Sequence, residues 1–223
     1  MMHQQISKKI FIYLFIFFIL VTVNNTKLSF DFYKIKTFDI NGLNHNETQK
    51  LQNDMDDYKN LNIFSFDKND LLKIIYSNKV VEELNITKIY PSKIKIQIKK
   101  TKFLAFTKKN GVDYIVLGNG NLIEKKEKNL KLPFIFGDID IKKFLEFKKL
   151  IDVSNFKFSE IENLYYFKSN RWDLLTRNGL ILKMPSDLNV KKLNLFFDLI
   201  KKNDFKNAKI IDLRQNNLMI VNE

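Results

Sequence analysis

Apolar and polar residues alternate without interruption over the stretch from Lys93 to Lys99. Three isoleucines fall on one side, and lysines with one glutamine fall on the other. A period of two predicts a β-strand with one buried face and one wet face. Tyr90-Pro91-Ser92 comes just before it, and proline lacks an N–H, so the chain is expected to turn there. Together with a strand expected over residues 80–89, the stretch predicts an antiparallel hairpin.

One strand and two helices are predicted before this hairpin. The strand spans residues 33–40 and ends at Asn41-Gly42, because both residues tolerate positive φ. Asn46 is predicted to cap a helix that runs to about residue 58, and Asp67 is predicted to cap the next helix. The order strand, helix, helix, strand, strand predicts a three-stranded sheet backed by two helices.

The pattern after residue 102 predicts a second, larger sheet. Asn178-Gly179 is a strong signal of a hairpin between the strands on either side of it. Gly118-Asn119-Gly120-Asn121 is interpreted as a tight turn, since strands lie on both sides of it. Helices are expected over residues 139–151 and after Asp187, which is predicted as a cap. The chain is therefore expected to be an α+β protein whose second domain is a mainly antiparallel β domain with two helices. Its strands are expected at 103–107, 112–117, 121–124, 161–167, 171–176, 180–184, 209–214 and 217–221.

The first segment carries an unbroken apolar run from Ile10 to Val23 behind Lys8 and Lys9. Fourteen residues is short for a bilayer span, which needs about 20, so a cleaved signal peptide is the alternative. The run is not followed by a small-x-small cleavage site, and flanking lysines snorkel to the interface. We expect a cytoplasmic tail over residues 1–9, a single transmembrane helix over 10–24 and a linker over 25–33. The remainder is expected to be exported, with the N-terminus cytoplasmic.

Composition excludes several kinds of chemistry. The chain has no cysteine and two histidines, which excludes disulfides and thiolate zinc sites and nearly excludes a histidine-based metal or catalytic site. The net charge of +13 is typical of proteins that bind polyanions, but the lysines are interspersed with acidic residues, which favours biased composition. The acidic cluster Asp54, Asp56 and Asp57 lacks the spacing of a calcium loop. We expect no catalytic residue, cofactor, metal, small-molecule substrate or nucleic acid.

Two single residues have competing interpretations. A lone Trp172 on a strand is more often part of the core than a binding aromatic. Arg214 is either half of a structural ion pair at a strand end or a residue that frames a partner-binding edge.

Several short motifs follow one another in an order that resembles the FtsQ/DivIB cell-division family. The first module, residues 34–101, resembles the POTRA domain of that family, and residues 102–223 resemble its β domain. Two departures stand out: Lys100 to Ala105 keeps only the alanine of an E-x-x-P-x-A motif, and Gln215 stands where the family often has an aromatic. The motifs are Ile40-Asn41-Gly42, Asn62-Ile63-Phe64 before Asp67, Tyr90 to Ile96, Leu132-Pro133 with Gly137, Arg171 to Leu174, Asn178-Gly179, Met184-Pro185 and Ile211 to Arg214.

The resemblance implies a non-catalytic, membrane-anchored divisome scaffold. Such a protein sits in the bacterial inner membrane at the division septum with its bulk in the periplasm. It binds FtsB- and FtsL-type bitopic proteins and links early and late division proteins. The alternative is a POTRA-containing component of outer-membrane protein assembly or translocation, which would need further repeats or a long β-barrel.

The last predicted strand is the candidate binding site. Four consecutive apolar residues, Leu218 to Val221, lie in a strand that is expected at a sheet edge. Such an edge exposes unpaired N–H and C=O groups, and addition of a partner strand covers them. The resemblance points the same way, because the family binds FtsB at this strand. Either Leu218 with Ile220, or Met219 with Val221, is expected to face a partner pocket. The candidate partner-binding residues are Arg214, Gln215, Leu218, Met219, Ile220 and Val221.

Overall fold

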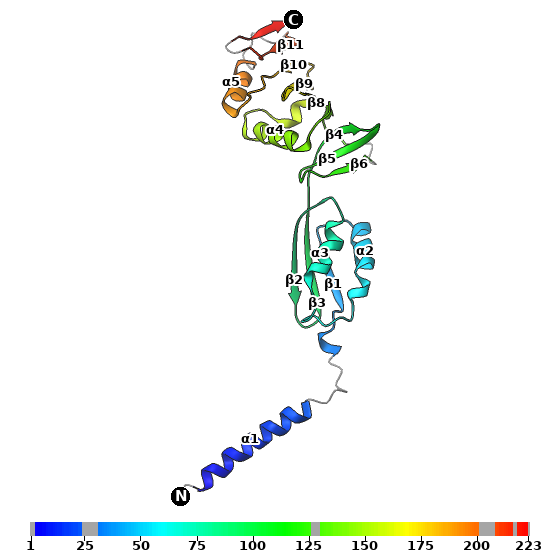
Figure 1. Ribbon diagram of the computed structural model, residues 1–223, viewed down its shortest axis with the longest axis vertical. Coiled ribbons are helices and arrows are strands. Elements are labelled where there is room, and N and C mark those ends of the chain that lie inside the picture. The colour runs from blue at the N-terminus through cyan, green and yellow to red at the C-terminus, as the bar shows by residue number, and fades with distance from the viewer. Residues whose placement is uncertain (1–2, 24–30, 126–129, 201–207, 216–217, 223) are drawn as a thin grey trace. The chain divides into compact units, whose positions relative to one another are not determined.

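The computed structural model describes residues 3–23, 31–125, 130–200, 208–215 and 218–222 (Figure 1). The chain divides into two compact units. The first consists of Met1–Leu71 and Asn85–Gln97, and the second of Leu72–Leu84 and Ile98–Glu223. The limits fall inside α3 (Lys68–Tyr76), β2 (Val81–Ile89) and β3 (Lys93–Lys100), so these elements contribute to both units.

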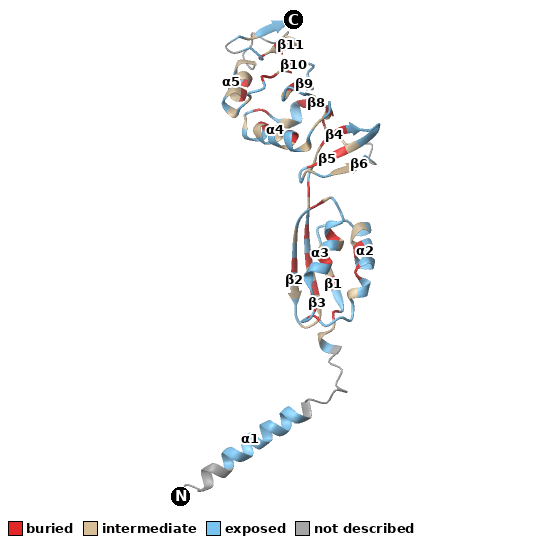
Figure 2. Cartoon of the chain, in the orientation of Figure 1, coloured by how far each residue is buried: buried red, intermediate tan, exposed pale blue. Residues whose placement is uncertain are grey.

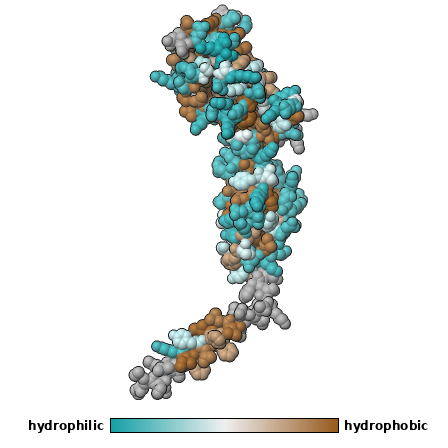
Figure 3. All heavy atoms as spheres, viewed as in Figure 1, coloured by the Kyte–Doolittle hydropathy of each residue, from teal (hydrophilic) through white to brown (hydrophobic). Residues whose placement is uncertain are grey.

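The first helix, α1 (His3–Val23), presents apolar side chains to its surroundings. The large apolar residues from Ile10 to Leu20 are between 46% and 76% exposed, and Figure 3 shows them as a hydrophobic surface. Among the residues that the structure describes, no helix combines the length and the apolar character needed to cross a membrane.

The first three-stranded sheet has the predicted order of elements. After the short 3-10 helix η1 (Asp31–Tyr33) come β1 (Thr37–Asn41), α2 (His45–Asp54), the 3-10 helix η2 (Asp56–Tyr58), α3, β2 and β3. The sheet order is β1-β3-β2, with β1 parallel to β3, so β1 and β2 form its edges. The alternation predicted along β3 is confirmed, because its three isoleucines are at most 6% exposed (Figure 2).

The cap of α2 differs from the prediction, whereas the cap of α3 is confirmed. Asn44, and not Asn46, is the N-cap: its side chain accepts the Glu47 N–H at 2.9 Å, and the Glu47 carboxylate accepts the Asn44 N–H at 3.0 Å. This reciprocal pair is a capping box, and it starts the helix two residues earlier than predicted. The Asp67 carboxylate accepts the Asn69 N–H at 3.0 Å at the start of α3.

Among the residues that the structure describes, the second sheet has nine strands in the order β12-β11-β10-β9-β8-β7-β4-β5-β6. Most described strand pairs are antiparallel, but β4–β7, β7–β8 and β10–β11 are parallel. Strand β7 was not predicted, because three residues are too few to show an alternation. The strands are β4 (Phe103–Lys109), β5 (Val112–Leu117), β6 (Leu122–Glu124), β7 (Phe134–Phe136), β8 (Ile161–Phe167), β9 (Arg171–Thr176), β10 (Ile181–Lys183), β11 (Ile210–Asp212) and β12 (Ile220–Asn222).

Two helices, α4 (Ile141–Val153) and α5 (Val190–Ile200), pack against this sheet through one hydrophobic core. Trp172 belongs to that core: it is 7% exposed, and its ring stacks on Phe147 with centroids 4.7 Å apart, which confirms the core interpretation. The predicted cap of α5 is wrong, because Asn189 accepts the Lys192 N–H at 2.9 Å. The Asp187 carboxylate pairs instead with the Lys192 ammonium.

Candidate partner-binding edge

Strand β12 is the terminal strand of the nine-stranded sheet. It pairs antiparallel with β11, with Asp212 opposite Ile220 and Ile211 opposite Val221. Within the described part of the chain, β12 has a neighbouring strand on one side only. Ile220 is 51% exposed and Val221 is 37% exposed. An edge strand with exposed apolar side chains offers both ladder groups and apolar surface to an added strand.

The strands from β9 to β12 place an apolar row on one face of the sheet. Leu174 lies opposite Leu182, Leu182 opposite Ile211, and Ile211 opposite Val221. The first three are at most 1% exposed and belong to the core that α4 and α5 cover. Since residues opposite each other share a face, Val221 continues the core row to the edge of the sheet.

The neighbouring row lies on the other face and is charged up to its last member. Asp173 lies opposite Lys183, Lys183 opposite Asp212, and Asp212 opposite Ile220. Ile220 is therefore an exposed apolar residue at the end of a charged row, whereas Val221 ends a buried one. Successive residues of β12 thus differ in the surroundings they offer to a partner.

A groove lies beside the edge on the helix side. It has a volume of about 410 Å³. Leu218 and Met219 both line it, although sequence analysis assigned them to opposite faces of one strand. They precede β12, so the alternation expected from residue 217 begins only at Ile220 in the described residues. The groove is lined by Pro185, Lys192, Leu195, Phe196, Leu199, Leu213, Gln215, Leu218 and Met219.

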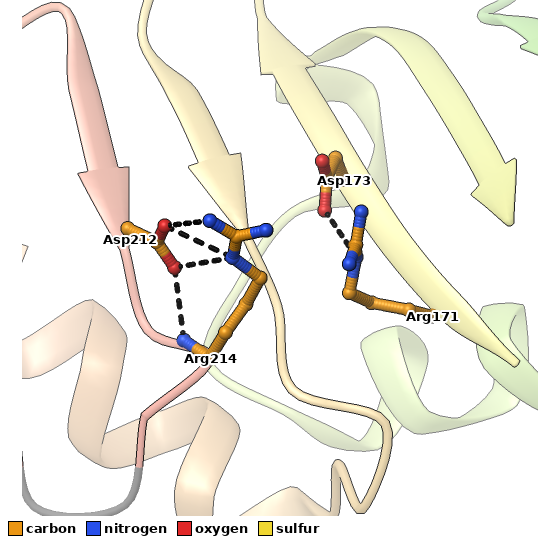
Figure 4. A network of polar contacts seen from close by, with 4 residues as sticks. All are labelled: Arg171, Asp173, Asp212 and Arg214. Atoms are coloured by element: carbon orange, nitrogen blue, oxygen red, sulfur yellow. Dashed lines mark hydrogen bonds and ion pairs between the residues drawn. The ribbon is translucent and has the colours of Figure 1, made fainter. Parts of the chain in front are cut away.

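Arg214 is held by Asp212 at the end of β11 (Figure 4). The guanidinium Nε lies 2.8 Å and 2.9 Å from the two carboxylate oxygens, and the Arg214 backbone N–H also donates to the Asp212 carboxylate at 3.1 Å. These hydrogen bonds lower the pKa of Asp212 and raise that of Arg214. The contacts of Arg214 are therefore those of a structural ion pair at a strand end. This ion pair orients the chain as it leaves β11.

The ion pair between Arg171 and Asp173 is more buried and less well formed (Figure 4). Their closest atoms, Arg171 Nε and Asp173 Oδ1, lie 3.3 Å apart, and both are buried without a hydrogen bond of good geometry. Burial raises the pKa of Asp173, and the positive charges of Arg171, Arg214 and Lys183 offset part of that effect. The Asp173 carboxylate belongs to the charged row, but its burial costs desolvation free energy in the folded state.

The structure brings all six sequence-predicted residues to one end of the nine-stranded sheet. Gln215, Leu218 and Met219 line the groove, Ile220 and Val221 form the edge, and Arg214 leads from β11 toward them. The side of the groove that α5 forms was not predicted from the sequence. The signal was Leu195 and Leu199, four residues apart and therefore on one side of the helix, which is not the side of the buried Leu193 and Phe197.

The fold and this edge define a class: a protein with a βααββ module followed by a mixed sheet that ends in an uncovered strand. Residues 33–100 match the family model described as "POTRA domain, FtsQ-type". Residues 105–214 match the model described as "Cell division protein FtsQ/DivIB, C-terminal". The chain belongs to the FtsQ/DivIB family of cell-division proteins.

Curated relatives carry the same name. The chain is 29% identical over 224 residues to "Cell division protein DivIB" of Clostridium botulinum, which covers 92% of this chain and 86% of the relative. It is 28% identical over 187 residues to the protein of that name from Bacillus subtilis, covering 80% of this chain and 70% of the relative. A solved extracytoplasmic domain of DivIB from Geobacillus stearothermophilus is 14% identical, with a TM-score of 0.35, covering 46% of this chain and 92% of that domain.

Proposed function

We propose that this protein is a non-catalytic divisome scaffold that captures a partner by strand addition at β12. The observation that carries the proposal is the uncovered apolar edge at Ile220 and Val221, beside the groove under Leu218. An added strand pairs its backbone with the free side of β12 and removes these side chains from water. Main-chain pairing supplies affinity, and side chains that enter the groove supply specificity.

The groove and the edge favour a partner segment with two parts. One part is an extended strand of a few residues that runs along β12. The other carries an apolar side chain that fills the space between Leu195 and Leu218, which are 56% and 60% exposed. Membership of the cell-division family supports FtsB- and FtsL-type bitopic proteins as the source of this segment, and a role in linking early and late division proteins.

We propose further that α1 is the membrane anchor of the scaffold. The support is its exposed apolar surface from Ile10 to Leu20, next to Lys8 and Lys9. A helix with so short an apolar run spans a bilayer only if the bilayer thins locally and the flanking lysines snorkel. The folded units then lie in the periplasm, at the division septum.

Site-specific photocrosslinking tests the binding site. A photoreactive residue replaces Ile220 in one full-length variant and Glu124, in the opposite edge strand β6, in a matched control. The proposal expects a crosslink to an FtsB-type protein from position 220 and none from position 124. Equal crosslinking from both edges, or crosslinking from position 124 alone, would remove β12 as the site.

Cellular location tests the scaffold role separately. A functional fluorescent fusion of the chain that includes α1 is expected to gather at midcell in dividing cells. A uniform distribution around the cell envelope would contradict the division role and favour a protein of envelope assembly.

A further inference from the structure

A chain of exposed aromatic rings lies on the first compact unit, far along the sequence from β12. Tyr33 touches Phe32 and Phe64 with ring centroids 5.4 Å and 5.1 Å apart, and Phe64 stacks on Tyr90 at 4.8 Å. Phe32, Phe64 and Tyr90 are 60%, 58% and 54% exposed. Contiguous exposed apolar surface on a folded unit marks an interaction site. We call these four residues the aromatic patch.

The backbone beneath the aromatic patch is firmly held. The Ile63 N–H donates to the Tyr33 carbonyl at 2.9 Å, and the Ile35 N–H donates to the Leu61 carbonyl at 2.9 Å. The Lys88 ammonium bonds to the carbonyls of Phe64 and Phe66 at 3.4 Å and 2.7 Å. The rings are therefore presented by a structured surface.

The patch lies at the end of the sheet where the chain enters the unit. In the parallel pair β1–β3, Thr37 lies opposite Lys93 and Asn41 lies opposite Gln97. Tyr33 precedes the Thr37 end and Tyr90 precedes the Lys93 end, so the patch sits at that end. Asn41 and the start of α2 lie at the other end.

The number of residues before the patch limits its distance from α1. Only residues 24–30 separate the end of α1 at Val23 from η1 at Asp31. Because an extended chain advances about 3.3–3.6 Å per residue, the start of η1 cannot lie more than about 30 Å from the end of α1, and the patch begins at the next residue, Phe32. If α1 is a membrane anchor, the tether keeps the patch within reach of the bilayer surface.

We propose that the aromatic patch inserts its rings into the headgroup region of the bilayer that holds α1. Tyrosine rings suit that region because they have an apolar body and a polar hydroxyl, and phenylalanine rings reach the boundary of the acyl chains. The patch offers three rings that are more than half exposed, so insertion of apolar surface is proposed to drive the contact, although the Lys88 ammonium lies beside Phe64. This inference rests on the proposed anchoring by α1.

Site-directed labelling of the full chain tests this contact. The native sequence has no cysteine, so a single introduced cysteine carries the nitroxide label without background. Leu61→Cys reports beside the patch, and His45→Cys reports at the opposite end of the same sheet. Both are reconstituted in vesicles of phosphatidylethanolamine with a minority of phosphatidylglycerol. Collision with oxygen and with a water-soluble nickel complex distinguishes a lipid-exposed label from a water-exposed one.

The expected result is a lipid-like accessibility at position 61 and a water-like accessibility at position 45, both unchanged by salt. Phe64→Ser with Tyr90→Ser should return position 61 to the water-like value. Tyr76→Ser, at an exposed aromatic outside the patch, should not. Circular dichroism checks that each variant is folded.

Vesicle flotation in high salt separates this inference from the anchor. A chain that floats with a water-exposed label at position 61 would overturn the patch contact and leave the anchor intact. A chain that does not float would overturn both. A label shielded only when other membrane proteins are added would replace the lipid by a protein partner and overturn the proposal.

Discussion

The two edges of the nine-stranded sheet solve the same problem in different ways. At β6, the Lys79 ammonium bonds to the Leu122 carbonyl at 3.3 Å, and Leu122 and Ile123 are half-buried against neighbouring clusters. At β12, Ile220 and Val221 are exposed, and no strand among the described residues lies on their outer side. The β6 edge is thus partly covered by neighbouring side chains, whereas the β12 edge is exposed. An exposed edge strand of this kind is expected where a partner strand docks.

Proline substitution at each edge should separate them most strongly. Ile220→Pro removes an N–H from the ladder with β11 and disrupts β12 itself, so FtsB-type binding should weaken at least about tenfold, the equivalent of about 1.4 kcal/mol. Glu124→Pro, in β6, should leave that affinity unchanged. Calorimetry on the full chain measures both, with circular dichroism as the check on folding. Equal affinities for Ile220→Pro and the wild type would exclude β12 as the docking edge.

Polar substitution in the groove should have the next largest effect. Leu218→Ser removes apolar surface that a bound partner would bury, and about 1 kcal/mol of binding free energy should be lost. The stability of the free protein should hardly change, because Leu218 is 60% exposed. Val153→Ser, at a residue 64% exposed on α4, is the matched control. Equal effects of the two variants on partner affinity would show that the groove takes no partner side chain.

The two aspartates of the charged row should differ in what they contribute to stability. Asp212→Asn removes the carboxylate that holds Arg214, and unfolding in urea should show a loss of about 1 kcal/mol. Asp173→Asn removes a carboxylate whose pKa is raised by burial, and the Arg171 side chain left behind is 22% exposed and can be hydrated, so its cost should be smaller. A larger cost for Asp173→Asn would mean that the buried ion pair contributes more than its geometry suggests.

The smallest expected effect is a difference between the two aspartates in how stability depends on pH. The pKa of Asp212 is lowered in the folded state, so the stability it contributes is present above its unfolded pKa and lost as pH falls through the folded value. The pKa of Asp173 is raised, so the folded state gains relative stability as pH falls from the raised value to the ordinary one. Below about pH 4, Asp212→Asn should flatten the acid loss of stability. Asp173→Asn should act at higher pH, between about pH 4 and the raised pKa of Asp173, where it removes the gain in stability and so steepens the acid loss. Urea unfolding as a function of pH measures both slopes; the reverse order would contradict these assignments.

Local patterns were enough to predict the strands that carry their own signal. The isoleucines of β3 show their alternation directly, Asn178-Gly179 marks a hairpin with Gly179 at φ 87°, and Asp67 caps α3 through its own carboxylate. Each of these features depends on residues a few positions apart. The run of four apolar residues from Leu218 to Val221 likewise predicted a strand with apolar side chains on both faces, without knowledge of its neighbours.

Other features depend on partners distant in the sequence, and only the packed chain decided them. Strand β7 has three residues and exists because β4 and β8 pair with it on both sides. The groove forms because α5 lies beside Leu218 and Met219, which precede β12. The charged row forms because the registers of β9, β10, β11 and β12 place its residues opposite one another. Periodicity reports which residues of one element share a face, but it carries no information on which element lies opposite. The sequence therefore predicted an apolar final strand. Its position at the sheet edge, the difference between its buried and its charged face, and the groove beside it follow from pairing and packing across the sheet.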